Sequence, residues 1–505
     1  MRKIYFLAAT LLALASCRER PGRPGPVNFT FAKISEFNVG GEGAAEISAF
    51  DPETDRLFVV NNSSGSTVDV FDFSNPSSIV PLSPIDILQF GGGVNSVAVK
   101  NGLLAIAVEA DPKTNPGSVV IFETDDLSSP EAVVTVGALP DMVAFSPNGR
   151  YIVTADEGEP NDDYTIDPEG SVSIIDVFSG YQVTSLNFAS FESQKSKLEQ
   201  DGFRIFGPNA SFAQDIEPEY VTIDAFSQTA WVTLQENNGI AKVDLRTKKI
   251  TDIFPMGTKN HQLPGNEMDA SDRDGIIGNL QNWPVLAYFM PDGIASYGLG
   301  SNTFLITANE GDTRDYEGFE EEERVKDLEL DPVAFPDAAI LQEDENLGRY
   351  TATITAGDTD GDGDFDEIYG IGARSFTIWN GRTGMMIRDY KDLEKDLLMA
   401  RPSRYDDTRS DNKGVEPEAV EVGNIRGRNI LFVGLERSDA VMVYELTGAS
   451  SLRFLQVLDG TNMPGDTPHD APEGLLFIPA SDSPNGRPLL LVSSEGDGKI
   501  TVYQN

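Results

Sequence analysis

Short apolar runs that each end in an acidic or amide turn recur along most of this chain. Within them hydrophobic and polar residues alternate, and β-branched and aromatic residues are frequent, which is typical of strands. Seven runs have this form: residues 57–62 (LFVVNN), 103–110 (LLAIAVEA), 151–158 (YIVTADEG), 230–237 (AWVTLQEN), 304–311 (FLITANEG), 430–437 (ILFVGLER) and 489–496 (LLLVSSEG). The pattern therefore predicts a sevenfold repeat of strand-forming units.

Each of these runs is flanked by further predicted strands. A shorter apolar run precedes it and is introduced by an acid in six repeats, at Glu46, Asp141, Glu219, Asp292, Glu418 and Glu473. A third run follows it, for example at residues 67–73 and 440–446, and a fourth follows in six repeats, for example at residues 182–188. The seventh repeat ends at Asn505 directly after its third strand, so it lacks a fourth.

The missing fourth strand is predicted at the opposite end of the chain, at residues 29–37 (FTFAKISEF). Pairing there would close a ring of four-stranded sheets and remove an open edge. We therefore predict an all-β fold, a seven-bladed β-propeller of the YVTN or WD40-like type that forms one domain over residues 28–505. A β-sandwich, or two stacked β domains, is the alternative. Insertions at about residues 189–213, 312–372 and 391–414 interrupt the repeat, and long loops on a rigid scaffold often carry function.

The first residues have the features of an export signal. Residues 1–16 combine a charged start, an apolar run and small residues before Cys17, the only cysteine. Leu14-Ala15-Ser16-Cys17 resembles the bacterial lipobox, in which the cysteine becomes the lipidated first residue of the mature protein. Residues 17–27 would then be the lipidated cysteine and a tether. The prediction is an exported bacterial lipoprotein at the outer membrane or cell surface that contacts the membrane only through its lipid. A soluble secreted protein with a fortuitous cysteine is the alternative.

The charge balance restricts the choice of partners. The chain has 38 lysines and arginines against 81 aspartates and glutamates, a formal net charge of −43. Such a surface repels nucleic acid, so we expect no nucleic-acid partner. It suits an exterior where divalent ions neutralise clustered carboxylates.

Several stretches together resemble the choice-of-anchor I family. They are residues 217–237, 269–275, 307–316, 358–367, 372–379, 414–418, 432–437 and 472–485. That family consists of exported bacterial proteins with β-propeller-like repeats and varied surface anchors, and it is similar to mesenchyme-specific cell-surface glycoproteins of biomineralising animals. The resemblance implies a surface propeller with acidic, calcium-associated behaviour. Some members carry an alkaline phosphatase-like label by similarity.

The densest acidic stretch is residues 357–370, GDTDGDGDFDEIYG. Its carboxylates are Asp358, Asp360, Asp362, Asp364, Asp366 and Glu367, and the glycines at 361 and 363 let the backbone fold tightly. Calcium takes six to eight oxygen ligands, so this spacing predicts a calcium site, with a solvated acidic turn as the alternative. Tyr369 stands where an EF-hand has its bidentate glutamate, which favours a non-helical loop. A second candidate metal site consists of Asp269, Asp272 and Asp274.

A further set of acids comes from equivalent positions of successive repeats. If the ends of the first and second strands share one face, these acids ring the mouth of a channel and attract cations. The set is Glu46, Asp141, Glu219, Asp292, Glu418 and Glu473 before the first strands, and Glu157, Glu236, Glu310, Glu436 and Glu495 at the ends of the second. Alternatively, they accept from backbone N–H groups in turns and pair with Arg314, Arg374 or Arg437.

Two functions follow from these features. The first is a surface binding or scaffold module with calcium as its cofactor, and a ligand that is cationic or is a phosphate ester bridged by calcium. The second is a calcium-dependent phosphoesterase, alkaline phosphatase-like or phytase-like, with Glu310, Asp312, Arg314, Asp315 and Arg374 as its catalytic group. The same five residues would otherwise form a salt-bridge network. With only two histidines and one cysteine, a zinc site has little support.

Overall fold

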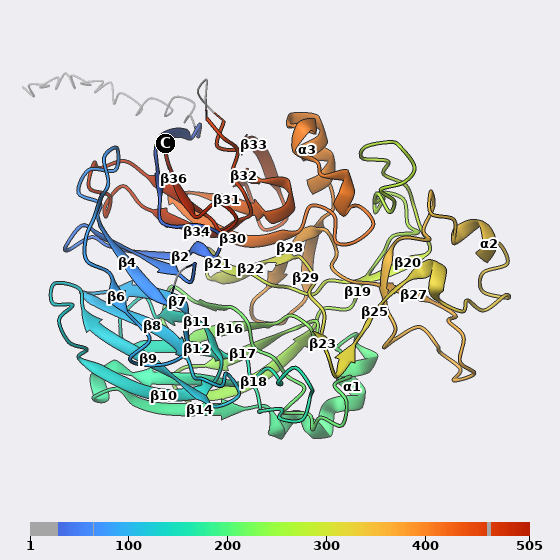
Figure 1. Ribbon diagram of the computed structural model, residues 1–505, viewed down its shortest axis with the longest axis horizontal. Helices are drawn as coiled ribbons and strands as arrows, with labels where there is room; N and C mark the ends of the chain where they lie inside the picture. The colour runs from blue at the N-terminus through green and yellow to red at the C-terminus, as the bar shows by residue number, and fades with distance from the viewer. Residues whose placement is uncertain (1–28, 64, 462–465) are drawn as a thin grey trace, which may run out of the picture.

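The computed structural model describes residues 29–63, 65–461 and 466–505 (Figure 1). The predicted signal peptide, Cys17 and the tether lie outside these residues. The described chain is an all-β structure dominated by four-stranded antiparallel sheets, so the predicted fold class is confirmed at that level. None of its helices is long and apolar enough to cross a membrane.

Seven antiparallel sheets follow one another along the chain, and each matches one predicted repeat. Their first strands are β2 (Ala44–Asp51), β7 (Gly93–Lys100), β11 (Pro140–Phe145), β15 (Val221–Ile223), β21 (Ile294–Leu299), β30 (Pro417–Ile425) and β34 (Pro472–Ile478). Their second strands are β3 (Arg56–Asn61), β8 (Leu103–Glu109), β12 (Tyr151–Asp156), β16 (Thr229–Leu234), β22 (Asn302–Asn309), β31 (Arg428–Leu435) and β35 (Leu489–Ser494). The second strands coincide with the seven apolar runs of the sequence.

The third and fourth strands complete each sheet. The third strands are β4 (Thr67–Asp72), β9 (Pro116–Glu123), β13 (Ser171–Asp176), β17 (Gly239–Asp244), β28 (Ser375–Asn380), β32 (Ala440–Leu446) and β36 (Lys499–Gln504). The fourth strands are the pair β5 (Val80–Pro81) and β6 (Ile85–Asp86), then β10 (Ala132–Ala138), β14 (Gln182–Asn187), β18 (Lys249–Pro255), β29 (Met386–Tyr390), β33 (Leu452–Leu458) and β1 (Ala32–Asn38). In the first sheet β5 and β6 both pair with β4, so its outer strand is interrupted.

The sheets are arranged about a common axis. Each first strand contacts the first strand of the next sheet, and β34 of the last sheet contacts β2 of the first. Figure 1 shows these strands meeting near the centre, with the third and fourth strands farther out. The last sheet is completed by β1, which pairs antiparallel with β36 from Ala32 opposite Gln504 to Asn38 opposite Lys499. This is the pairing predicted for residues 29–37.

The core lies between neighbouring sheets, as β8 illustrates. Its alternate residues Leu104, Ile106 and Val108 pack against the β3 and β4 strands of the preceding sheet. Ala105 and Ala107 point the other way and pack with Ile152 and Ile175 of the following sheet. Because successive side chains of a strand point to opposite faces, a strand covered on both sides becomes apolar throughout. This explains why the second strands read as continuous apolar runs.

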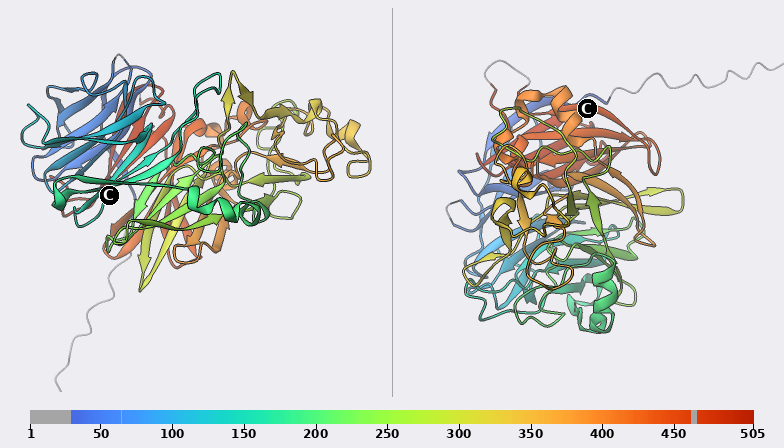
Figure 2. Two further views of the ribbon diagram at one scale, coloured as in Figure 1. Left: turned by 90° about the horizontal axis from the view of Figure 1, so that it is seen from below. Right: turned by 90° about the vertical axis from the view of Figure 1, so that its right-hand side faces the viewer.

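A further sheet, built from five short strands, projects to one side of these seven sheets (Figure 2). It contains β19 (Thr258–Asn260), β20 (Val285–Tyr288), β25 (Glu322–Arg324), β26 (Thr351–Thr353) and β27 (Ile368–Gly370), with β20 and β27 parallel. Met268, Val325, Tyr350 and Ile368 are buried in its own core. We call this unit the extension. It joins the predicted insertion 312–372 to residues 258–288, a segment that the sequence analysis did not recognise as an insertion.

Short helices and one hairpin occupy the remaining loops. The extension also carries β23 (Asp315–Tyr316), β24 (Phe319–Glu320), η3 (Val325–Asp327) and α2 (Ala338–Leu341). The other two predicted insertions hold η2 (Ala189–Gln194) and α1 (Lys195–Gln200), and α3 (Leu393–Ala400), η4 (Pro402–Arg404) and η5 (Asp407–Arg409). Single turns η1 (Val177–Ser179) and η6 (Glu436–Ser438) follow β13 and β31.

Candidate functional site

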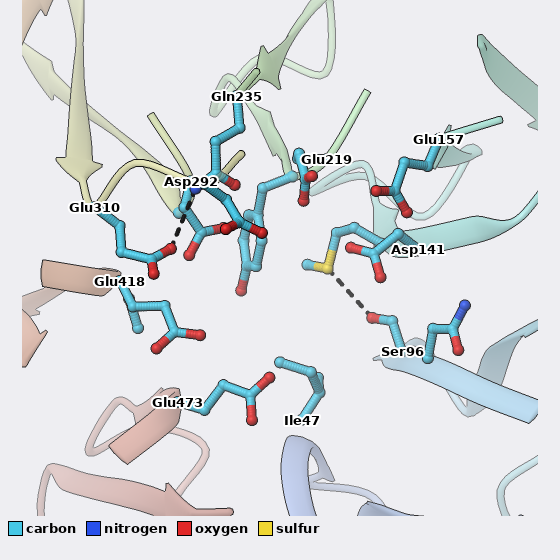
Figure 3. Close-up of a pocket in the computed structure, with 16 residues that line it drawn as sticks. Ile47, Ser96, Asp141, Glu157, Glu219, Gln235, Asp292, Glu310, Glu418 and Glu473 are labelled. Carbon is cyan, nitrogen blue, oxygen red and sulfur yellow. Dashed lines mark hydrogen bonds between the residues drawn. The ribbon is translucent and has the colours of Figure 1, made fainter. Parts of the chain in front are cut away.

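A carboxylate-lined cavity of about 290 Å³ opens where the first strands converge (Figure 3). We call it the axial pocket. Eight acids line it: Asp141, Glu157, Glu219, Asp292, Glu310, Asp312, Glu418 and Glu473. Its wall also contains the apolar side chains of Ile47, Met142 and Ala419 and the ring of Tyr220. The sequence analysis named seven of these acids, all except Asp312, for the mouth of a channel, and all seven lie in this one pocket.

A repeated backbone feature places the acids at the axis. Leu139, Met290, Glu416 and Ala471 each precede a proline and an acid, and each has a positive φ, between 47° and 50°. The register of the first strand is irregular at the acid itself in the β11, β30 and β34 sheets. A bulge re-aims a side chain that regular pairing would hold in the sheet. The Pro-acid dipeptide of the sequence is therefore the local signal for an inward-facing carboxylate.

Backbone hydrogen bonds hold the ends of first and second strands on the same face. The N–H of Glu157 donates to the carbonyl of Leu139 at 2.8 Å, and the N–H of Glu436 donates to that of Glu416 at 3.0 Å. The N–H of Gly311 donates to the carbonyl of Met290 at 3.2 Å, and the N–H of Glu495 donates to that of Ala471 at 3.0 Å. Acids from both strand ends consequently gather at one end of the axis.

Little positive charge balances the axial pocket. Lys413 lies at its rim and reaches Glu310 at 3.0 Å and Asp312 at 3.3 Å, and Gln235 donates to Glu310 at 3.1 Å. Within residues 29–63, 65–461 and 466–505, the other six acids form no ion pair. The Oε2 atoms of Glu418 and Glu473 are buried without a hydrogen-bond partner in the part of the chain that the structure describes. The pocket thus concentrates uncompensated negative charge.

The pKa values of these acids respond to that environment. Burial, followed by repulsion from Glu473, raises the pKa of Glu418 well above its usual range, and burial does the same for Glu473, with repulsion from Glu495. The pKa of Asp141 rises from 3.8 to about 7, first through burial and then through repulsion from Glu159 and Glu109. Part of the pocket is therefore protonated near neutral pH, which is the response expected of carboxylates that lack a cation.

Neutralising two pocket acids is expected to stabilise the protein. Acids with folded-state pKa values above their unfolded values favour folding while protonated, so stability is lost as the pH rises from about 4 toward 7 and above. Glu418→Gln with Glu473→Gln should raise the free energy of unfolding by about 2 kcal/mol at pH 8 and change it little at pH 4. The measurement is the melting temperature across this pH range.

The matched control is Glu42→Gln with Glu192→Gln, which removes the same charge at two exposed positions that do not line the pocket. It should leave the pH dependence as in the unmodified protein. A double pocket variant that is less stable than the unmodified protein at pH 8 would contradict the assignment of unbalanced repulsion.

Four other predicted mouth acids, Glu46, Glu236, Glu436 and Glu495, do not line the pocket. Glu236, which follows β16, is 6% exposed, and its Oε2 has no hydrogen-bond partner among the described residues. The carboxylate oxygens of Glu436, Glu310 and Glu416 lie within 4.8 Å of one another. Arg409 pairs with Glu416 at 2.7 Å and Arg437 with Glu436 at 3.0 Å, so this second group is largely neutralised. Neither Glu416, which lies inside the recognised stretch 414–418, nor Lys413, directly before it, was predicted as a site residue.

The acidic loop 357–370 lies on the extension and divides into two oxygen groups. Asp358, Asp360 and Asp362 form one, and Asp364 and Asp366 form the other together with Asp331; in each, the oxygens lie within 4.8 Å. Asp331 was not predicted, and a parallel bridge between Leu330 and Phe365 brings it to the loop. Glu367 belongs to neither group and accepts from the hydroxyl of Tyr369 at 2.7 Å. Partial desolvation and then the charge of Asp362 raise the pKa of Asp364 to about 6.

Comparison with known protein families finds a match to this chain. Residues 46–449 match the choice-of-anchor I domain. The chain belongs to this family. The family resemblance seen in the sequence motifs is thereby confirmed, and the matched region covers the axial pocket except Glu473, together with the whole extension.

Two animal proteins are similar to this choice-of-anchor I chain. The mesenchyme-specific cell surface glycoprotein of Strongylocentrotus purpuratus is 27% identical over 325 residues, which span 54% of the chain and 41% of that protein. Gigasin-3a of Magallana gigas is 27% identical over 188 residues, 32% of the chain and 66% of that protein. The chain therefore covers less than two thirds of either relative.

Two solved structures show a distant likeness. A chain in the crystal structure of the mitotic checkpoint complex has a TM-score of 0.49 at 11% identity, with 99% of both chains covered. Hydrazine synthase of Kuenenia stuttgartiensis has a TM-score of 0.47 at 10% identity, with 93% of this chain and 97% of that one covered. At these scores we draw no conclusion from either.

The other predicted metal group of this choice-of-anchor I protein is already engaged with protein partners. Asp272 pairs with Arg349 at 2.5 Å, and Asp274 accepts from the N–H of Ile276 at 2.7 Å. Asp269 accepts from the N–H of Asn279 at 2.8 Å, and burial raises its pKa to about 7. Their oxygens do not form a compact ligand group among the described residues.

The five residues considered for phosphoester chemistry are not brought to one site. Glu310 and Asp312 line the axial pocket, whereas Asp315 lies in the β23 hairpin. Arg314 is 1% exposed and binds Asp215 at 2.5 Å and Glu217 at 3.0 Å. Arg374 is 3% exposed and donates to the carbonyls of Asp269, Ser410 and Asn412. Both arginines link loops together, as in the salt-bridge alternative.

Proposed function

We propose that this protein is a lipid-anchored, calcium-binding surface module whose seven sheets are the blades of a closed β-propeller. The observation that carries the calcium-binding function is the pair of aspartate groups on loop 357–370, each with three carboxylate oxygens within 4.8 Å. Calcium prefers carboxylate oxygens in flexible sites, and an ion would remove the mutual repulsion of these aspartates.

The ring of first-strand contacts and the β1–β36 pairing support the propeller assignment. A propeller closed by strands from both ends of the chain leaves only short edges exposed. The family match, and the name of the sea urchin relative as a cell surface glycoprotein, suggest a surface or exported protein. The lipobox-like Leu14-Ala15-Ser16-Cys17 would supply the anchor.

Geometry does not favour the phosphoesterase alternative. The described residues that line the axial pocket include no arginine or lysine, so the pocket itself repels a phosphate. Arg314 and Arg374 are committed to buried partners. A calcium-binding module needs the aspartates of loop 357–370 and no free guanidinium.

Calcium is expected to stabilise the unmodified protein through the loop. At a calcium concentration of tens of Kd the gain is about 2 kcal/mol, seen as an increase in melting temperature over protein in a chelator. Asp360→Asn with Asp364→Asn removes one charge from each group and should abolish most of that increase. In chelator the variant should be at least as stable as the unmodified protein, because repulsion between aspartates is lost.

The control variant is Asp125→Asn with Asp482→Asn, which neutralises two exposed aspartates elsewhere. It should keep the full calcium response. An unmodified protein with the same melting temperature in calcium and in chelator would rule out the calcium-binding function.

A further inference from the structure

The axial pocket combines two kinds of lining. Carboxylates from several first strands face its centre, and Figure 3 shows Asp292, Glu418 and Glu473 pointing into the space above Ile47. Met142, Ala419 and the ring of Tyr220 add apolar surface to the same wall. A ligand complementary to this pocket carries positive charge together with a hydrocarbon segment.

Carboxylates without partners among the described residues point to a ligand in the pocket. Glu157 lines the pocket, is only 9% exposed, and its carboxylate accepts no hydrogen bond within the described chain. The buried Oε2 atoms of Glu418 and Glu473 are likewise unsatisfied. Leaving such groups unpaired costs stability, so their presence calls for a cation that satisfies them.

The spacing of the carboxylates argues for an organic cation over a bare metal ion. Calcium needs several oxygens at 2.3–2.6 Å, which requires ligands already close to one another. Of the pocket acids, only Glu310 belongs to a described group with oxygens within 4.8 Å, and that group already holds positive side chains. An ammonium group has three donors that reach separate carboxylates, and its methylene stem gains from apolar contact.

We propose that the axial pocket binds the ammonium group of an alkylamine. Asp292, Glu418 and Glu473 accept from the ammonium hydrogens, and the methylene stem lies against Tyr220, Met142 and Ile47. The Tyr220 ring adds attraction for the cation at its face. This inference rests on the proposed binding function and names the chemical class of its ligand. A free diamine and a lysine side chain of another protein present the same group.

Isothermal titration of the purified protein with three compounds tests the assignment. They are 1,4-diaminobutane, the blocked amino acid N-acetyl-lysine methylamide, and the same compound acetylated on its side-chain nitrogen. We expect saturable binding of at least one amine, none of the acetylated compound, and weaker binding as sodium chloride is raised. Glu418→Gln with Glu473→Gln should raise the Kd for the amine by about tenfold or more, while Glu42→Gln with Glu192→Gln should not change it.

The outcomes separate the possibilities. Binding of the lysine derivative alone supports the inference with a protein side chain as the source, and binding of the diamine supports it with a free amine. If calcium or magnesium binds in a manner lost in the pocket variant, and neither amine binds, the inference is overturned in favour of a metal site. If nothing binds to protein that keeps its calcium-induced rise in melting temperature, the inference fails while the proposed calcium-binding function stands.

Discussion

Arg314→Met is expected to lower the free energy of unfolding by about 3–5 kcal/mol, because it leaves two buried carboxylates without their charged partner. Asp215 would keep hydrogen bonds from the N–H groups of Phe206 and Gly207, but Glu217 would lose its charged partner. The arginine also lies 4.5 Å from the centre of the Phe206 ring. It connects the extension to the segment before β15, so the loss should loosen the whole extension.

The pH dependence of the stability of Arg314→Met tests the buried network more specifically than the loss of stability at one pH. Burial already raises the pKa of Glu217 to about 8 despite the adjacent guanidinium, and removal of that guanidinium raises it further. A raised folded-state pKa means that stability is lost as the pH increases, so the deficit should be larger at pH 9 than at pH 6. Adding Glu217→Gln to Arg314→Met should recover part of the stability. The measurement is chemical denaturation at both pH values.

Arg273→Met is the matched control. Arg273 is exposed, and its partner Asp272 retains Arg349, so this variant should lose less than about 1 kcal/mol. Arg314→Lys should fall between the two, since lysine keeps the charge but lacks the planar fork of donors. Equal losses for Arg314→Met and Arg273→Met would contradict the role assigned to the buried network.

Removal of the closing strand is expected to have the largest effect of all. A chain that starts at residue 39 lacks β1 and leaves β36 without its outer partner. It also loses Phe29 and Phe31, which are 4% and 2% exposed, and the packing of Ile34 and Phe37. Burial of two phenylalanine side chains alone contributes about 3–6 kcal/mol. The shortened chain should aggregate through its open edge or melt far below a chain that starts at residue 28.

Adding β1 back as a separate peptide tests whether its pairing with β36 is what stabilises the protein. A peptide of residues 28–39 should bind the shortened chain by strand addition and restore its melting temperature and monomeric elution. The same peptide with Ile34→Lys and Phe37→Lys should not, because those side chains pack in the core between β1 and the first sheet. A shortened chain that is monomeric and as stable as the longer one would show that closure is dispensable.

The local pattern of apolar and polar residues was sufficient to predict the strands and their order. The seven apolar runs became the second strands, and β1 paired with β36 as expected, because alternation and turn residues act within a few positions of each other. The extension was only half recognised. Its sheet combines residues 258–288 with residues 312–372 across the intervening β21 and β22, and such pairing leaves no periodic trace in either segment.

The acids show the same division. The Pro-acid dipeptides predicted inward-facing residues such as Glu418 and Glu473, and the aspartate-rich loop was evident from the sequence. That six pocket carboxylates have no cation partner among the described residues could not be predicted, since pairing depends on which of several arginines and lysines the folded chain brings near.

By itself the sequence determined an acidic all-β chain of seven repeated units, its closing strand and its family, because each of these follows from residues close together or from matching stretches. Tertiary structure alone decided that Asp331 joins the loop, that Arg314 is buried in an ion network, and that six acids of the axial pocket have no cation partner among the described residues. Those facts depend on contacts between segments far apart in the chain, where packing and desolvation, and not local preference, fix which groups meet.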